Sequence, residues 1–93
     1  MSQYQITCIT KSHANGGHEH ITSAGGSSPR WLLNVDQIIS RIDLKVDQFY
    51  VQDYLGRRAY VGVIRPLGRR AYIRTYADGV WTDNLLALDA CMV

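Results

Sequence analysis

Apolar and polar residues alternate near the start of the chain. Residues 3–11 keep this period of two, which predicts a β-strand. Residues 13–17 and 25–29 are rich in turn-forming residues and predict loops. We expect a second, less regular strand at residues 18–24 between them.

The period then changes to that of a helix. Asn34 is a favourable N-cap, and Gln37 follows it at the spacing of a capping box. The next apolar residues have the i, i+3, i+4, i+7 spacing of one buried helix face: Val35, Ile38, Ile39 and Ile42. We therefore expect a short helix over about 35–43, which needs a sheet to pack on.

Three strands are expected after the helix, at residues 48–53, 57–65 and 69–76. A short fourth strand around 80–82 follows a turn at Gly79, and the leucine-rich C-terminal segment is expected to cover the core. The pattern predicts an α+β fold in the order β-β-α-β-β-β. Its antiparallel sheet of four to five strands has one main helix packed on one face.

Two hairpin loops, "DYLGR" at 53–57 and "RPLGR" at 65–69, share one form. Both fit a three-residue loop with Gly in the left-handed position, which pairs the first and last residue of each stretch. One face of the sheet then collects apolar residues: Phe49, Val51, Ala59, Val61, Val63, Ala71 and Ile73. The other face collects Tyr50, Gln52, Arg58, Tyr60, Gly62, Ile64, Arg70, Tyr72 and Arg74.

The length and composition predict a single compact domain over residues 1–93. No apolar run reaches the roughly 20 residues of a membrane span, and the first residues lack the apolar block of a signal peptide. We therefore expect a cytoplasmic protein with no membrane partner. Cys8 and Cys91 are expected as two separate buried thiols. A disulfide is the alternative, which the lack of a secretion signal disfavours.

Positive charge is concentrated in one segment. Residues 56–74 contain six arginines and no acid, so this segment carries +6 and the remainder −4. The segment also contains "GRRAYV" at 56–61 and "GRRAYI" at 68–73. Loop and strand lengths explain this twelve-residue spacing, but they do not explain why Arg and Tyr face outward both times.

Several stretches of the chain resemble one family. They are "YQITCI", "HEHI" followed by "GG", "FYV" and "ADGVWTDNLLAL" with a later Cys, and together they span nearly the whole chain. This pattern resembles small bacterial proteins grouped as domain of unknown function 3892. In the family pattern we expect Pro where this chain has Asp89, and Arg more often than His where this chain has His20. The resemblance implies a compact domain and no catalytic residue.

A histidine cluster offers the candidate metal site. His13, His18 and His20 lie close in sequence, and imidazole ligands suit zinc, nickel or iron. Their spacing matches no known ligand motif, and a solvated polar loop is the favoured interpretation. No nucleophile elbow or phosphate-binding glycine loop is present. The sequence therefore favours a non-enzymatic protein without a cofactor.

The Tyr/Arg sheet face is the strongest functional signal. Tyr50, Tyr60 and Tyr72 would offer rings on which bases stack, and Arg58, Arg70 and Arg74 would bind phosphate. The leading hypothesis is a binding module for a nucleotide or single-stranded nucleic acid. The alternatives are a solvated face stabilised by cross-strand pairs, and a face covered by residues 31–42, by a protein partner or by a second copy in a homodimer.

Overall fold

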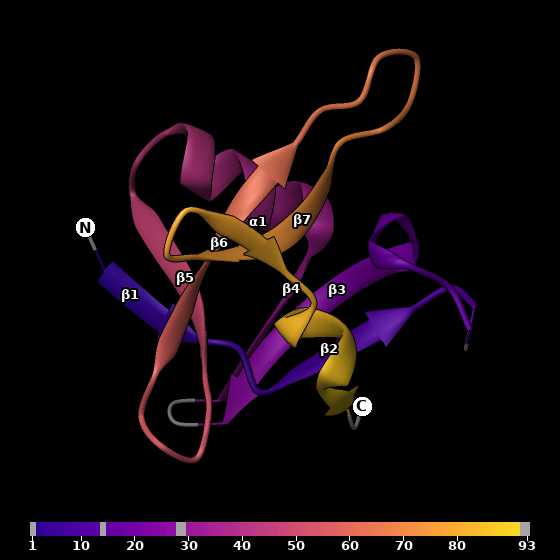
Figure 1. Cartoon of the computed structure of the whole chain (residues 1–93). Coiled ribbons are helices and arrows are strands. Elements are labelled where there is room, and N and C mark those ends of the chain that lie inside the picture. The colour runs from indigo at the N-terminus through magenta and orange to yellow at the C-terminus, as the bar shows by residue number, and fades with distance from the viewer. Residues whose placement is uncertain (1, 14, 28–29, 92–93) are drawn as a thin grey trace.

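The computed structural model describes residues 2–13, 15–27 and 30–91, which form one α-helix and two β-sheets (Figure 1). The five-stranded sheet contains, in spatial order, β1 (Ser2–Gln5), β5 (Asp47–Gln52), β6 (Arg58–Ile64), β7 (Tyr72–Ala77) and β8 (Val80–Thr82). The four-stranded sheet contains β4 (Arg30–Asn34), β3 (Ile21–Ser27), β2 (Cys8–Lys11) and β9 (Asp89–Ala90). The helices are α1 (Val35–Asp43) and the short 3-10 helices η1 (His18–His20) and η2 (Asn84–Ala87).

The predicted α+β class is confirmed, but the single antiparallel sheet is replaced by two mixed sheets. Strand β1 pairs in parallel with β5, and β9 pairs in parallel with β2, whereas the other neighbours are antiparallel. Residues 14, 28 and 29 of the predicted loops lie outside the described residues, as do residues 1, 92 and 93.

The predicted first strand is divided between the two sheets. Ile6 and Ile9 are both buried, at 1% and 2% exposure, so the alternation is interrupted between them. The Ile6 amide donates to the Tyr50 carbonyl in one sheet, at 2.8 Å, and the Thr7 amide donates to the Gly25 carbonyl in the other, at 2.8 Å. The chain therefore crosses from one sheet to the other at this point, where both inner faces need an apolar side chain.

The helix occurs where the pattern places it. The Gln37 amide donates to the Asn34 side chain at 2.8 Å, and the Asn34 amide donates to the Gln37 side chain at 3.0 Å, which completes the capping box. The segments before the helix differ from the prediction. Residues 18–20 form η1, the predicted loop at 25–29 is strand as far as Ser27, and β4 was not predicted.

The core lies between the two sheets and α1, which contacts strands of both. Its most deeply buried large side chains come from the five-stranded sheet, the crossing segment between β1 and β2, the helix and η2: Ile6, Ile38, Phe49, Ile73, Thr75 and Leu85. In Figure 1 the loop between β6 and β7, in orange, projects beyond the rest of the molecule. None of the described helices is long and apolar enough to span a membrane.

The expectation of two separate thiols is wrong, because Cys8 and Cys91 form a disulfide with their Cα atoms 4.8 Å apart. The parallel pairing of β9 with β2 places Asp89 beside Cys8. The Cys91 amide then donates to the Ile9 carbonyl at 3.1 Å, which brings the two sulfurs together. A two-residue strand at the end of the chain gives no periodic signal, so the sequence did not show this pairing.

Candidate functional site

The two hairpin loops differ although their sequences are alike. In the first, the Asp53 amide donates to the Arg57 carbonyl at 3.0 Å, and this confirms the predicted three-residue loop. In the second, Ile64 pairs with Tyr72 and residues 65–71 form the connection, so the predicted pairing of Arg65 with Arg69 is wrong. The shift is by two residues, which leaves the side chains of β6 and β7 on their predicted faces. Arg70 and Ala71 were predicted on the sheet faces but lie in the loop before β7.

The Asp53 carboxylate explains the tight first loop. It accepts hydrogen bonds from the amides of Leu55 and Arg57, both at 2.9 Å, and from Nε of Arg57 at 2.7 Å. These bonds hold the pKa of Asp53 below its usual value, and the bond from the Arg57 amide has the largest effect. Arg65 occupies the same position in the second loop, where it cannot accept such bonds, and it pairs instead with Asp43.

Four aromatic side chains form a row across four neighbouring strands of the five-stranded sheet. Tyr50 of β5 pairs with Tyr60 of β6, Tyr60 pairs with Tyr76 of β7, and Tyr76 pairs with Trp81 of β8. Tyr60, Tyr76 and Trp81 remain 37%, 45% and 41% exposed. We call these four residues the aromatic row. They lie on the face opposite the core.

Arg58 lies at one end of the aromatic row. Its guanidinium carbon is 4.2 Å from the centroid of the Tyr50 ring, within cation–π distance. Nε of Arg58 donates to Gln52 at 3.0 Å, and Nη1 donates to Gln3 at 3.2 Å, which links three strands. Within the described residues no carboxylate pairs with Arg58, so its charge is uncompensated.

The other predicted ligand residues lie elsewhere. Tyr72 pairs with Ile64, four residues along β7 from the aromatic row. Arg70 is in the loop before β7, where it donates to both oxygens of Asp36 at 3.0 and 3.1 Å. Arg70 and Tyr72 line an open pocket of about 340 Å³ with Glu19, Pro66 and Arg69. The structure therefore separates these two from Tyr50, Arg58 and Tyr60.

Ion pairs compensate most of the basic segment. Four of its six arginines pair with acids from other parts of the chain: Arg57 with Asp53, Arg65 with Asp43, Arg70 with Asp36, and Arg74 with Asp83. These pairs reduce the uncompensated charge of the segment from +6 to +2, which belongs to Arg58 and Arg69. The positive field that the sequence suggested is therefore much weaker in the folded chain.

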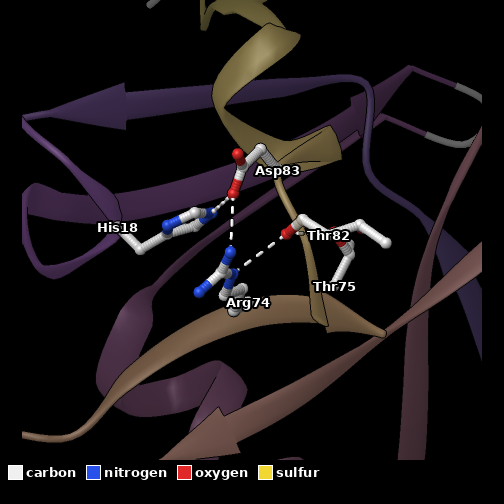
Figure 2. A network of polar contacts seen from close by, with 5 residues as sticks. All are labelled: His18, Arg74, Thr75, Thr82 and Asp83. Carbon is white, nitrogen blue, oxygen red and sulfur yellow. Dashed lines mark hydrogen bonds and ion pairs between the residues drawn. The ribbon is translucent and has the colours of Figure 1, made fainter. Parts of the chain in front are cut away.

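Arg74 belongs to a polar network at the end of β8 (Figure 2). It donates to the Thr82 carbonyl at 3.1 Å and to the Asp83 carboxylate at 2.8 Å. His18 of η1 is 8% exposed, and its Nε2 lies 3.9 Å from Asp83 without a hydrogen-bond partner. The pKa of His18 is held below 6.5, mainly because the ring is buried and also because the positive charge of Arg74 is near.

The three histidines do not form one site. The rings of His13 and His20 have centroids 4.6 Å apart, and the Ser12 hydroxyl lies 3.0 and 3.4 Å from their Nδ1 atoms. His18 turns away toward Asp83. Over the described residues, no group of three metal-ligating side chains comes together.

Sequence reasoning missed Tyr76 and Trp81, although a signal for them was present. Asp78 and Gly79 both have positive φ, 53° and 82°, and form a two-residue turn that sets Tyr76 opposite Trp81. Gly62 makes room for the Trp81 ring, because a Cβ there would lie 3.0 Å from the indole. The turn sequence "ADGVW" thus carried the information that completes the row.

One comparison with known proteins gives a match. The family model described as "Protein of unknown function (DUF3892)" matches residues 5–89, nearly the whole chain. Neither a curated protein nor a solved structure matches it.

Proposed function

We propose a function for this chain from its own surface, because it belongs to the family described as "Protein of unknown function (DUF3892)" and that description names no activity. The proposed function is a non-enzymatic module that binds single-stranded nucleic acid on the aromatic row. The observation that carries it is the exposure of Tyr60, Tyr76 and Trp81 on adjacent strands. Such rings are stacking surfaces for unpaired bases, and each stacked base contributes about 1–3 kcal/mol.

The ring geometry favours separate bases over one large flat ligand. Tyr50 and Tyr60 are tilted by 51° at a centroid distance of 6.0 Å, and Tyr76 and Trp81 by 69° at 5.3 Å. No single plane can lie flat on two neighbours with such tilts, so a base stacks on one ring at a time. The exposed rings of Tyr60, Tyr76 and Trp81 are the stacking surfaces, because the Arg58 guanidinium already lies over the Tyr50 ring. A flexible single strand can turn its bases independently, whereas a duplex holds them stacked inside.

Electrostatics is expected to make a small contribution. Arg58 is the uncompensated cation beside the row, so about one phosphate contact is expected. With one contact, the logarithm of the affinity for a single strand falls with a slope of about −0.7 against the logarithm of salt. We therefore expect binding to weaken only about threefold when salt increases fourfold.

The test is a fluorescence anisotropy titration of a labelled oligothymidylate of about 12 nucleotides, a length within the range of single-strand sites. Tyr76→Ala is expected to weaken binding about fivefold or more, since it removes one stacking surface. Tyr54→Ala is the matched control, because Tyr54 is 94% exposed at a hairpin tip away from the row. Equal loss in both variants, or no binding at the lowest salt, would contradict the proposal.

The contribution of Arg58 is tested in the same way. Arg58→Gln is expected to flatten the salt dependence, whereas Arg69→Gln removes an equal charge from the β6–β7 loop and should leave it unchanged. The competing occupant of the face is a second copy of the chain, as exposed Tyr and Arg are also common at protein interfaces. A dimer in light scattering that Tyr76→Ala dissociates, together with absent oligonucleotide binding, would establish that alternative.

A further inference from the structure

A smaller cavity, which is open to solvent on one side, lies on the other face of the five-stranded sheet, away from the aromatic row. It has a volume of about 160 Å³ and is lined by Tyr4, Trp31, Leu33, Arg41 and Phe49. These residues come from β1, β4, α1 and β5, so the cavity forms where the helix and the edges of both sheets meet. The function proposed above makes no use of it.

The walls of this cavity are mainly aromatic. The ring centroids of Tyr4 and Phe49 are each within 5.8 Å of Trp31, and Tyr4 and Phe49 are stacked at 5.8 Å. Phe49 is 1% exposed, so its contacts fix the base of the cavity. An apolar cavity of roughly 150 Å³ is large enough to bind benzene. The volume therefore suits one six-membered ring with a small substituent.

Arg41 places a positive group on the cavity wall. Its Nη1 donates to Asp47 at 2.8 Å, and Asp47 is 7% exposed. The Arg41 side chain is 45% exposed, so the pair joins a buried carboxylate to a guanidinium that is open to solvent on one side, and the hydrogen bond holds the guanidinium in one orientation. Among the described residues the Arg41 side chain has no further hydrogen-bond partner, and a guanidinium has five N–H donors. Donors therefore remain for a ligand.

We propose that this cavity binds a small planar aromatic carboxylate. The ring would contact the Tyr4 and Trp31 side chains, and the carboxylate would accept two hydrogen bonds from Arg41, the geometry that guanidinium groups favour. The unused N–H donors of Arg41 select this ligand class, because Asp47 already balances the guanidinium charge and the wall is otherwise lined by aromatic and aliphatic side chains.

Benzoate and benzamide are the probes, since they have the same shape and differ in charge. Chemical shifts of the backbone amides are followed by NMR during titration of the full chain. We expect benzoate to shift the amides around Trp31, Arg41 and Phe49 saturably, and benzamide to bind about tenfold more weakly. Equal affinities, or no saturable shift with either probe, would overturn the proposal without any variant.

The double variant Arg41→Gln/Asp47→Asn tests the role of the ion pair. It replaces both charged side chains with neutral polar ones, so no buried acid is left unpaired. It is expected to bind benzoate no better than benzamide. The matched control is Arg65→Gln/Asp43→Asn, which removes an exposed ion pair outside the cavity and should keep the preference for benzoate. A double variant that still prefers benzoate tenfold would also overturn the proposal.

Discussion

The β5–β6 and β6–β7 hairpins contain nearly the same six residues, "GRRAYV" and "GRRAYI", but place them differently. In the first copy Arg58 pairs with Gln52 directly after a tight loop, and Tyr60 joins the aromatic row. In the second copy Arg70 remains in a longer loop beside Asp36, and Tyr72 lies outside the row. The equivalent residues of a repeat therefore have different surroundings.

The residue before each loop accounts for much of this difference. Asp53 accepts three hydrogen bonds from Leu55 and Arg57 and so closes the first loop. Arg65 has no acceptor to offer at that position and pairs with Asp43 instead. The alternation within the repeated hexapeptide therefore sets the sheet face of each strand residue. The residue before the loop, Asp53 or Arg65, sets where the pairing of the two strands begins.

The largest expected difference between the copies concerns their alanines. Ala59 is 1% exposed in the core, whereas Ala71 is half-buried in the second loop. Ala59→Leu should therefore lower the free energy of unfolding by about 1–3 kcal/mol through overpacking. Ala71→Leu should change it by less than about 0.5 kcal/mol. Urea unfolding of both variants measures this, and equal losses would show that the two copies are equally buried.

The glycines provide the case in which the copies should agree. Gly56 and Gly68 have φ of 82° and 75°, and a Cβ at either position would meet nothing within 4 Å. Gly56→Ala and Gly68→Ala should each cost about 1 kcal/mol, because only the left-handed backbone opposes them. Unfolding midpoints that differ strongly between these variants would mean that one loop has another conformation in solution.

The smallest expected effect is a pH dependence of the free energy of unfolding, which arises from His18 near the second copy of the repeat. Because the pKa of His18 is held below 6.5, the unfolded chain binds more protons than the folded chain below that pH. The stability linked to His18 is therefore present above pH 6.5 and is lost as the pH falls through the lowered pKa. Burial and then the charge of Arg74 lower the pKa of His18, and Asp83 and Glu19 oppose them.

Urea midpoints measured above and below pH 6.5 should show this loss. His18→Gln is expected to reduce the difference between the two midpoints, whereas His13→Gln, on an exposed side chain, should retain it. A difference that His18→Gln leaves unchanged would show that another group is responsible.

Local sequence signals predicted the local structure correctly. The Asn34 capping box located the helix, and the alternation along β5 to β7 separated the core face from the Tyr/Arg face. Features that depend on distant residues were not predictable in this way. The change of sheet after Ile6, the disulfide of Cys8 and the pairing of Tyr60 with Tyr76 all depend on where other segments lie.

The candidate site was therefore predicted in part. The sequence placed Tyr50, Arg58 and Tyr60 together on one face of the sheet, and the structure has them there. It assigned Tyr72 where the structure has Tyr76, because the second loop was taken to be as short as the first. It also overestimated the positive charge, since the acids that pair with Arg65 and Arg70 lie 22 and 34 residues away in sequence.

The most direct test of the aromatic row compares Tyr60→Ala with Tyr72→Ala, two substitutions at equivalent positions of the repeat. In an oligothymidylate titration, Tyr60→Ala should weaken binding about fivefold or more, whereas Tyr72→Ala should change it less than about twofold. Equal losses, or a loss only in Tyr72→Ala, would contradict the assignment of the binding surface to Tyr50, Tyr60, Tyr76 and Trp81.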